Sequence, residues 1–435
     1  MNLNKLIELV KKSNPSVVAA RLSALASGNE ANIGFSKFLP SVVATAEYNK
    51  NFNKNLGREV DGNKIEYGDN NYGSSTKNAS ISADYNLFNS GRDFFSLRTH
   101  KYAAKAYEYE ESNVTQESIL NSVRLYHYII LLEEQKKAKL EEENARAELR
   151  LIAASKQKLG SFGPGDKLKA ESSYLEAKMA TAELDRVIKE KRMELNHHLD
   201  LRSDQNLFLE NPTGGGLKIG VADVENRIKD AIESDPQLKK FLEEKKQVED
   251  SLRLAKLDML PIVTAGVRAG ASMEDDRYSG EILLKQNQEH VKRTETMVGL
   301  NAKVNFPIFS GFSGVNRLRA QQRHLESYSV KIESRKRAIQ DNVVNIINNI
   351  KYYKDMIPSL EKSLRLQTEI FDGVLVSYKN GGSSMTDVLL ARSSLERVKT
   401  ELLKEKYNLL VSKLELLKQI GKLSTENIIN LGGFL

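Results

Sequence analysis

The residues best suited to chemistry in this sequence are its carboxylates, its six histidines and two aspartates beside glycine-rich turns. The histidines have neither HExxH nor another paired metal-ligand spacing, and P-loop, strand-linked GxGxxG and GxSxG motifs are absent. Most carboxylates lie in mixed-charge helical patterns, where solvation is the default role. Asp166 and Asp387 each follow a glycine-rich turn and open a helical pattern, where aspartate is a favoured N-cap. These patterns predict no enzyme, no metal site and no cofactor.

Composition restricts the class of protein further. The 435 residues contain 65 Lys and Arg against 58 Asp and Glu, a formal net charge of +7, and no cysteine or tryptophan. The lack of cysteine excludes disulfides and thiolate chemistry. The basic runs at 189–192 and 334–337 lie in mixed-charge helical patterns, so we expect solvated faces and no nucleic acid partner. Because no segment approaches about 18 uncharged apolar residues, we expect no transmembrane helix.

An internal repeat with a constant offset organises the chain. Matching residues recur 221 positions apart: Asn14-Pro15 with Asp235-Pro236, Leu39-Pro40 with Leu260-Pro261, Phe88 with Phe309, Gly160 with Gly381, Asp166 with Asp387, Leu168 with Leu389, and Ala170 with Ala391. We interpret this as a duplicated unit. The first repeat is predicted to span 1–200 and the second 223–422, with a linker at 201–222 and a C-terminal tail at 423–435.

Alternating apolar and polar residues predict two β-strands in each repeat. The predicted strands are 41–52, 79–88, 262–270 and 299–308. Together they make a sheet with one apolar and one polar face. This pattern fits a membrane-spanning strand with an apolar lipid side, and it fits equally a half-buried hairpin of a soluble domain. We expect the polar segments 53–77 and 271–296 to form long external loops.

Long helical patterns favour the membrane alternative. The predicted helices are one of about 25–35 residues before the strands of each repeat, long ones at 92–158 and 314–379, and returning ones at 166–198 and 387–420. The first long pattern contains neither proline nor glycine and predicts a rod of about 100 Å. Such a rod has to pack beside other helices to bury its apolar stripe. Within the second we expect a kink or local unwinding at Pro358.

Four amphipathic strands are too few to close a barrel. An open sheet in a membrane leaves the N–H and C=O groups of its edges unpaired, at several kcal/mol each. Two chains would supply eight strands around an interior filled by side chains, whereas three would supply twelve and leave a modest lumen. The pattern therefore predicts a trimer with a twelve-stranded barrel and a tube of helices.

Three motifs occur twice at the same offset. They are an Asn/Asp-Pro pair followed about 25 residues later by Leu-Pro, the strand-to-helix junctions LFNSGRDF at 87–94 and PIFSGFSG at 307–314, and the helical hairpins KLGSFGPGDKLKA at 158–170 and YKNGGSSMTDVLLA at 378–391. Together they resemble the TolC family of outer-membrane efflux and secretion channels over essentially the whole chain. The resemblance implies an α+β membrane protein. Four strands per chain would contribute to the twelve-stranded β-barrel of a homotrimer, and the long helices would form a periplasmic α-helical barrel.

The resemblance also implies a function, partners and a location. A channel of this family is the passive exit duct of a tripartite efflux pump or a type I secretion system. It docks on a periplasmic adaptor (membrane fusion) protein and an inner-membrane pump of the RND or ABC type, and it is surrounded by outer-membrane lipid. The first residues lack the features of a signal peptide, which leaves a cytosolic protein or a processed chain. The resemblance favours an outer-membrane protein that extends into the periplasm and whose signal peptide has been removed.

In this family the hairpins form the periplasmic tip, where a tyrosine and acidic residues line or latch a constriction. The matching positions are Tyr378, Asp387 and Asp166. Three copies of one aspartate around a three-fold axis would concentrate negative potential, while helix capping is the alternative role of both aspartates. The adaptor-contacting tips are predicted to contain Gly160, Gly163, Gly165, Gly381 and Gly382, and the strand-to-helix turns to contain Gly91 and Gly311.

Two positions depart from the pattern of some family members. A basic latch residue and a second acidic ring are replaced here by Ser383 and Leu390, so we expect opening to be controlled differently. The competing hypothesis for the whole chain is a soluble coiled-coil scaffold or interaction protein with β-hairpin insertions.

Overall fold

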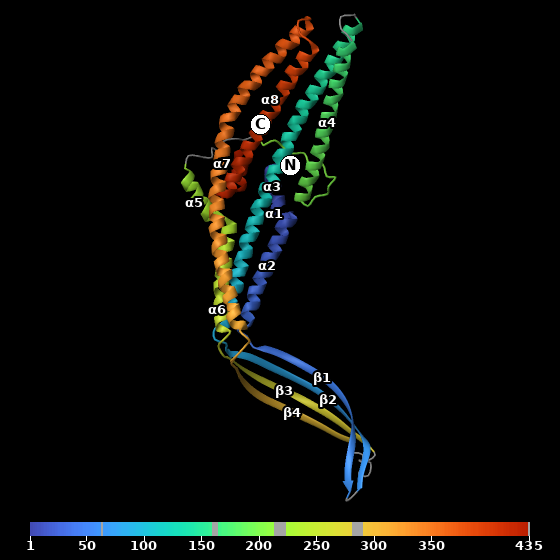
Figure 1. Ribbon diagram of the computed structural model, residues 1–435, viewed down its shortest axis with the longest axis vertical. Coiled ribbons are helices and arrows are strands. Elements are labelled where there is room, and N and C mark those ends of the chain that lie inside the picture. The colour runs from blue at the N-terminus through green and yellow to red at the C-terminus, as the bar shows by residue number, and fades with distance from the viewer. Residues whose placement is uncertain (62–63, 159–163, 213–222, 281–289, 434–435) are drawn as a thin grey trace. The chain divides into compact units, whose positions relative to one another are not determined.

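The computed structural model describes residues 1–61, 64–158, 164–212, 223–280 and 290–433. In chain order its elements are α1 (Leu3–Ser13), α2 (Pro15–Ser36), β1 (Ser41–Asp61), β2 (Lys64–Phe88), α3 (Arg92–Lys158), α4 (Pro164–His198), α5 (Val224–Ser234), α6 (Pro236–Leu257), β3 (Ile262–Gly280), β4 (His290–Asn305), α7 (Ser313–Lys379), α8 (Met385–Gln419) and α9 (Thr425–Leu431) (Figure 1). Two helices, two strands and two long helices therefore occur in the same order in both repeats, which is the predicted α+β class.

The chain divides into two compact units, and each unit draws on both repeats. A helical unit comprises Met1–Ser27, Ala104–Glu244 and Tyr328–Leu435, and a sheet unit comprises Gly28–Ala103 and Lys245–Ser327. The sequence repeats are therefore not separate bodies. Each contributes two strands to one unit and a pair of long helices to the other, as expected when a repeated element cannot bury its apolar faces alone.

The first helical region of each repeat is split in two, where the sequence predicted one helix. The breaks fall at Asn14 and Asp235, whose ψ angles are 124° and 115°. Both residues precede a proline, which sterically disfavours helical geometry in the residue before it. Each side chain then caps the next helix: Asn14 Oδ1 accepts the Val17 N–H at 3.2 Å, and Asp235 Oδ1 accepts the Leu238 N–H at 2.6 Å.

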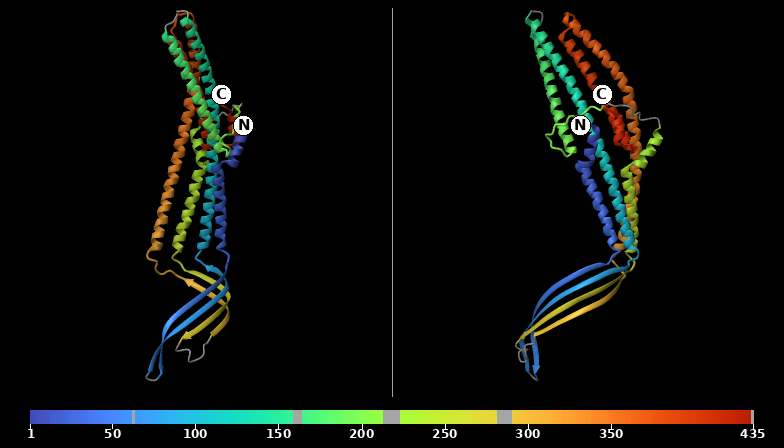
Figure 2. Two further views of the ribbon diagram at one scale, coloured as in Figure 1. Left: turned by 90° about the vertical axis from the view of Figure 1, so that its right-hand side faces the viewer. Right: turned by 180° about the vertical axis from the view of Figure 1, so that it is seen from behind.

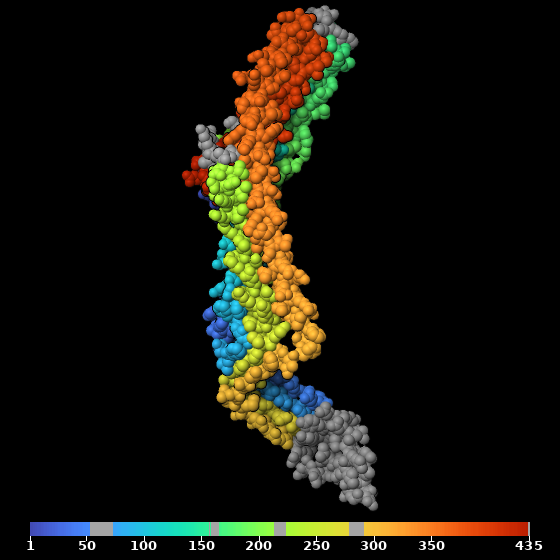
Figure 3. Space-filling model, turned by 60° about the vertical axis from the view of Figure 1, so that its left-hand side comes forward, coloured from blue at the N-terminus to red at the C-terminus, as the bar shows by residue number. Residues whose placement is uncertain are grey.

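The four long helices agree with their predicted bounds to within two residues. In the helical unit α3 runs beside α4, and α7 runs beside α8 (Figure 2). The short helix α5 packs against α7 (Figure 3), where Ala231 joins an apolar cluster with Ile339 and Ile347. A kink or local unwinding was expected at Pro358; every residue of α7 is described and helical, so the unwinding does not occur. Across the described ranges, none of the helices has both the length and the apolar character needed to cross a membrane.

The strands form one antiparallel sheet in the order β1-β2-β3-β4 (Figure 1). They are longer than predicted, because backbone pairing continues from the alternating segments into the polar ones. The prediction of external loops is therefore wrong for 53–61, 64–77, 271–280 and 290–296. The remaining residues of the two predicted loops, 62–63 and 281–289, lie outside the described residues. Strand β4 ends at Asn305, three residues earlier than predicted and before Pro307, which has no N–H for a ladder.

The register places the predicted apolar residues of all four strands on one face. Paired residues form the rows Val42–Ala83–Val267–Leu300, Ala44–Ile81–Ala269–Val298 and Tyr85–Ala265–Ala302. A bulge at Leu87 brings Phe88 opposite Val263, which keeps the face apolar to the end of β2. This face is open in the single chain: the exposed fractions are 83% for Leu300 and 79% for Val298.

Helix α8 ends in a turn that requires glycine. Gly421 has a φ of +68°, its N–H donates to Lys418 O at 3.0 Å, and the Lys422 N–H donates to Leu417 O at 2.8 Å. These two bonds form a Schellman motif, in which the residue after the helix is left-handed. A Cβ at this position would also lie 2.4 Å from Cβ of Ser234.

We expect Gly421→Ala to lower the free energy of unfolding by more than about 2 kcal/mol, because the left-handed penalty of about 1–2 kcal/mol adds to the clash. Gly373→Ala is the matched control: this glycine lies in the interior of α7 in open space, so alanine should raise the free energy of unfolding by about 0.5–1 kcal/mol. Urea unfolding in detergent, followed by circular dichroism, measures both. Equal stability of the two variants would contradict the assignment.

Candidate functional site

The second helical hairpin turns at two adjacent glycines. Gly381 has a φ of +84°, and its N–H donates to Tyr378 O at 3.1 Å. The Gly382 N–H donates to Ser377 O at 2.9 Å, which completes a second Schellman motif at the end of α7. A Cβ on Gly382 would approach Ser377 Oγ to 2.9 Å. The left-handed φ of Gly381 therefore requires glycine for the turn itself, whatever this residue contacts outside the chain.

Asp387 belongs to the cap that starts α8. The Ser384 hydroxyl accepts the Asp387 N–H at 3.2 Å, and the Asp387 carboxylate accepts the Ser384 hydroxyl at 2.7 Å and the Ser384 N–H at 2.9 Å. This is a capping box with aspartate in the third helical position. The same bonds, that of the hydroxyl most of all, lower the pKa of Asp387. The side chain remains exposed, so capping leaves a charged carboxylate at the tip.

Tyr378 is fully buried, in an apolar cluster that joins four helices. Its neighbours in this cluster are Leu149 and Ala153 of α3, Ala170 of α4, Phe371 of α7, and Met385, Val388 and Leu395 of α8. Burial raises the pKa of the Tyr378 hydroxyl, and the charge of Asp166 raises it further. Tyr378 thus lies inside the protomer and not on its surface, and the charge of Asp166 acts on it from the other repeat.

At the first hairpin only part of the predicted tip can be placed. Asp166 is half-buried in the first turn of α4, and Gly165 is exposed with open space around it. Gly160 and Gly163 lie outside the described residues. At the two positions that depart from the family pattern, Ser383 Oγ lies 2.8 Å from Ser377 Oγ, and Leu390 is 62% exposed.

The strand-to-helix turns contain Gly91 and Gly311, with φ angles of +81° and +60°. They do not occupy equivalent positions in the repeats. Each turn has two successive left-handed residues, Ser90-Gly91 in the first repeat and Gly311-Phe312 in the second. Each repeat therefore uses glycine at one of the two positions and accepts a strained residue at the other.

Sequence reasoning missed a buried charged cluster on the long helices. Glu142 of α3 is 3% exposed and Glu396 of α8 is 4% exposed, although the sequence pattern placed carboxylates on solvated faces. Arg392 Nη2 lies 3.1 Å from Glu396, and Arg146 pairs with Glu142 and also donates to Ser173 Oγ of α4 at 2.9 Å. Glu142, Arg146 and Glu396 also line one surface cavity together, so the cluster links α3, α4 and α8. The sequence does place an arginine four residues from each glutamate, but this spacing is equally typical of ion pairs on the exposed surface of a helix.

The two glutamates respond differently to burial. Burial raises the pKa of Glu396, and Arg392 only partly opposes it. Burial acts on Glu142 in the same direction, but Lys139 and Arg146 outweigh it, so the pKa of Glu142 is lowered. Breaking one of these pairs would leave a buried charge uncompensated.

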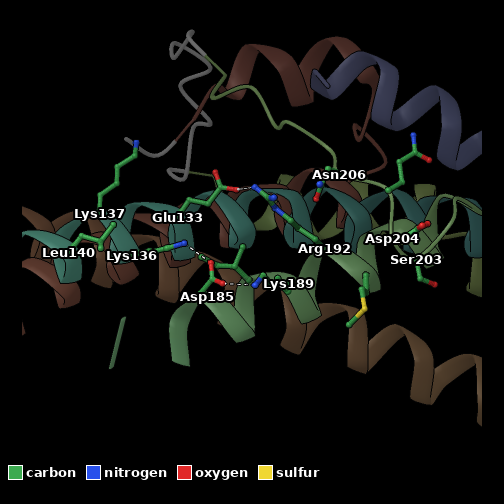
Figure 4. A pocket seen from close by; sticks show the side chains of 13 residues that line it. Glu133, Lys136, Lys137, Leu140, Asp185, Lys189, Arg192, Ser203, Asp204 and Asn206 are labelled. Carbon is green, nitrogen blue, oxygen red and sulfur yellow. Dashed lines mark hydrogen bonds and ion pairs between the residues drawn. The ribbon is translucent and has the colours of Figure 1, made fainter. Parts of the chain in front are cut away.

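A surface cavity of about 610 Å³ lies between α3, α4 and residues 203–206 (Figure 4). Five of its charged side chains are paired with one another: Lys136 and Lys189 lie 2.5 and 2.7 Å from Asp185, and Arg192 lies 2.6 Å from Glu133. The two lysines lower the pKa of Asp185 to about 2. An ionised, paired carboxylate of this kind is a poor general base.

The histidines do not converge on a metal site in the part of the chain that is described, where no group of three or more His, Asp or Glu side chains could hold a metal ion. His127 is only 1% exposed, and burial lowers its pKa to about 4. It is therefore a neutral core residue at physiological pH.

Comparison with known families agrees with this geometry. The family model described as "Outer membrane efflux protein" matches residues 6–199 and 227–422, which together make up most of both repeats. The chain belongs to this family. Membership places it in the outer membrane, as the sequence motifs predicted, and does not favour a soluble scaffold.

Individual relatives are distant. The outer membrane protein TolC of Escherichia coli (strain K12) is 24% identical over 189 residues, which cover 43% of this chain and 38% of that protein. The matched region thus spans well under half of that relative.

Solved structures share the fold over nearly the whole chain. The CmeC outer membrane channel of Campylobacter jejuni has a TM-score of 0.77 at 16% identity and covers 98% of this chain and 88% of that one. The outer membrane protein VceC of Vibrio cholerae has a TM-score of 0.74 at 14% identity, and the match covers 100% of this chain and 97% of that one. The four-stranded sheet and very long helices of this chain thus form a fold shared with these two outer membrane proteins.

The capping box at the tip can be tested locally. We expect Ser384→Ala to speed amide hydrogen exchange in residues 385–388 by about fivefold, because loss of an N-cap costs about 1 kcal/mol of helix stability. Thr386→Ala, which removes an exposed hydroxyl from the first turn of the same helix, is the control and should leave exchange within about twofold. Exchange followed by mass spectrometry measures both, and similar rates in the two variants would contradict the assignment.

Proposed function

We propose that this chain is one protomer of a homotrimeric outer-membrane channel that serves as the passive exit duct of a tripartite export system. The observation that carries this proposal is the sheet, whose apolar face is continuous over four strands and open in the protomer. A soluble protein rarely leaves so large an apolar surface exposed. Acyl chains are the surroundings that such a face requires.

The dimensions of the apolar face fit a bilayer. On β2 the face extends from Ala79 to Phe88. At about 3.4 Å per residue and a strand tilt of about 40°, these nine steps span roughly 23 Å along the membrane normal. The apolar band of outer-membrane barrels is about 25 Å tall. The opposite face carries Asp84, Arg268 and Lys303, which suits a water-filled lumen.

The edges of the sheet require further chains. Strands β1 and β4 each pair on one side only within the described protomer. Unpaired backbone groups in hydrocarbon cost several kcal/mol each, so β1 of one protomer has to pair with β4 of the next. Three protomers supply the twelve strands that leave a lumen. The long helices would then assemble as a periplasmic tube.

The partners follow from the family. The duct would receive substrate from an inner-membrane pump through a periplasmic adaptor protein, with the pump of the RND or ABC type, in efflux or in type I secretion. The hairpin glycines would present the adaptor-contacting tips. Asp387, exposed and charged, would form an acidic ring at the constriction, and Tyr378 with Asp166 would hold the two hairpins together. No residue is assigned to catalysis.

Reconstitution tests the channel directly. We expect the purified protein to need detergent for solubility, to migrate as a trimer in it, and to give stepwise conductance in planar lipid bilayers, because the apolar face and the edges are satisfied only in that assembly. A chain that stays monodisperse and monomeric without detergent would contradict the proposal and favour the coiled-coil scaffold.

The acidic ring is tested by block of the channel current. We expect Asp387→Ala to weaken block by a trivalent cation by about tenfold or more, because the substitution removes one negative charge from each of three protomers around a narrow pore. Asp372→Ala, at an exposed aspartate in α7, is the charge-matched control. Since Ser384 lowers the pKa of Asp387, block in the wild type should persist when the pH falls below the ordinary pKa of aspartate. Unchanged block in Asp387→Ala would remove the ring but not the fold.

A further inference from the structure

The two faces of the sheet carry opposite charge near the hairpin end. Three successive rows on the apolar face, from Tyr48 to Phe52 on β1, contain four cationic side chains and one carboxylate, Asp275. The three interleaved rows on the polar face, from Glu47 to Asn51, contain four carboxylates and one cation, Arg293. These counts cover the side chains that the structure describes. An overall excess of one charge in this part of the sheet does not explain the segregation, because residues that are adjacent in sequence lie on opposite faces and carry opposite charges.

The cations of the apolar face are distributed one to each strand. They are Lys50 of β1, Lys77 of β2, Arg277 of β3 and Lys292 of β4. All four are exposed. At about 4.8 Å between strands they extend over about 14 Å, and they lie within three rows, or roughly 14 Å along the strands. The single carboxylate, Asp275, lies 3.6 Å from Nε of Arg277, so the group as a whole remains cationic.

Aromatic rings and small residues complete the surface. Lys50 Nζ lies 4.7 Å from the centre of the Phe52 ring, and Lys77 Nζ lies 6.0 Å from that of Tyr48. In the row next to Tyr48 and Lys77, three alanines, Ala46, Ala79 and Ala271, line a shallow notch of about 410 Å³, whose other lining residues are Glu47, Tyr48, Lys77, Asn78 and Met273. Aromatic rings at this level suit the interface between headgroups and acyl chains, and the alanine side of the notch suits an acyl chain.

We propose that Lys50, Lys77, Arg277 and Lys292 form a binding site on each protomer for a multiply phosphorylated glycolipid of the outer leaflet. Its phosphates would contact the cations, and its acyl chains would lie on the alanine notch and the apolar rows below. The site rests on the proposed function, which directs the apolar face toward lipid. The hairpin ends of the strands then face the outer leaflet, because the other ends connect to the helices assigned to the periplasm.

The spread of the cations favours a headgroup with several charges. One phosphate can contact one or two of these side chains, whereas cations on four strands match a wide headgroup with two phosphates. A phospholipid with a single charge would use only part of the site. The proposal therefore predicts selectivity for phosphate number and not only for negative charge.

Adjacent residues on β4 provide the matched pair of variants. Lys292→Gln and Arg293→Gln each remove one cation, but Lys292 lies on the apolar face and Arg293 on the polar face. The probe is diphosphorylated lipid A in phosphatidylcholine nanodiscs that contain the full trimer, with the bound lipid counted by native mass spectrometry over a titration. We expect Lys292→Gln to weaken binding about fivefold, Arg293→Gln to leave it within about twofold, and the triple variant Lys50→Gln/Lys77→Gln/Lys292→Gln to weaken it about a hundredfold.

Further arms separate the remaining explanations. Lys292→Arg should bind as the wild type does, and lipid A without phosphates should bind the wild type as weakly as the triple variant binds lipid A. Equal binding by Lys292→Gln and Arg293→Gln, or binding of phosphatidylglycerol as tight as that of lipid A, would overturn the proposal. Conductance of the same preparations identifies which conclusion fails. Conducting channels without selectivity refute only the lipid site, whereas a wild type that does not insert refutes the exit duct as well.

Discussion

The constraint on which this protein depends is that an amphipathic sheet of four strands cannot satisfy itself. Among the described residues, its apolar face is largely exposed and each edge strand pairs on one side only. In the proposed channel, lipid covers the apolar face and neighbouring protomers pair with the edge strands, because each unpaired backbone group in hydrocarbon costs several kcal/mol. Under this proposal membrane insertion and oligomerisation are one requirement, and the outer-membrane family agrees with the insertion.

The helical unit is held together by different means. Two of its apolar clusters combine helices of both repeats, whereas a third lies within the second repeat. The same capping arrangements occur in both repeats or at both long helices of the second. Asn14 and Asp235 each cap the N-terminus of the helix that follows a break, and α7 and α8 each end in a Schellman motif with glycine. Between these ends lies a buried charged cluster around Glu142 and Glu396 that needs its arginines to remain paired.

Part of the candidate site was predictable from residue type and spacing. Asp387 was expected either at a constriction or in a cap, and the capping box with Ser384 is present while the carboxylate stays exposed. The burial of Tyr378 and its proximity to Asp166 were not predictable, because they depend on how hairpins from two repeats pack. The same holds for Glu396, whose local sequence resembles that of an ordinary solvated helix face.

The sequence by itself determined the duplication, the bounds of the long helices and the side of each strand that is apolar. These properties are local, since they depend on a period of two or 3.6 residues and on proline and glycine positions. Tertiary structure decided the strand lengths, the mixing of repeats in both units and the segregation of charge between the sheet faces. These properties depend on which backbone groups form hydrogen bonds and which strands lie side by side. Pairing between residues about 200 positions apart cannot be recognised from the local sequence pattern of either strand.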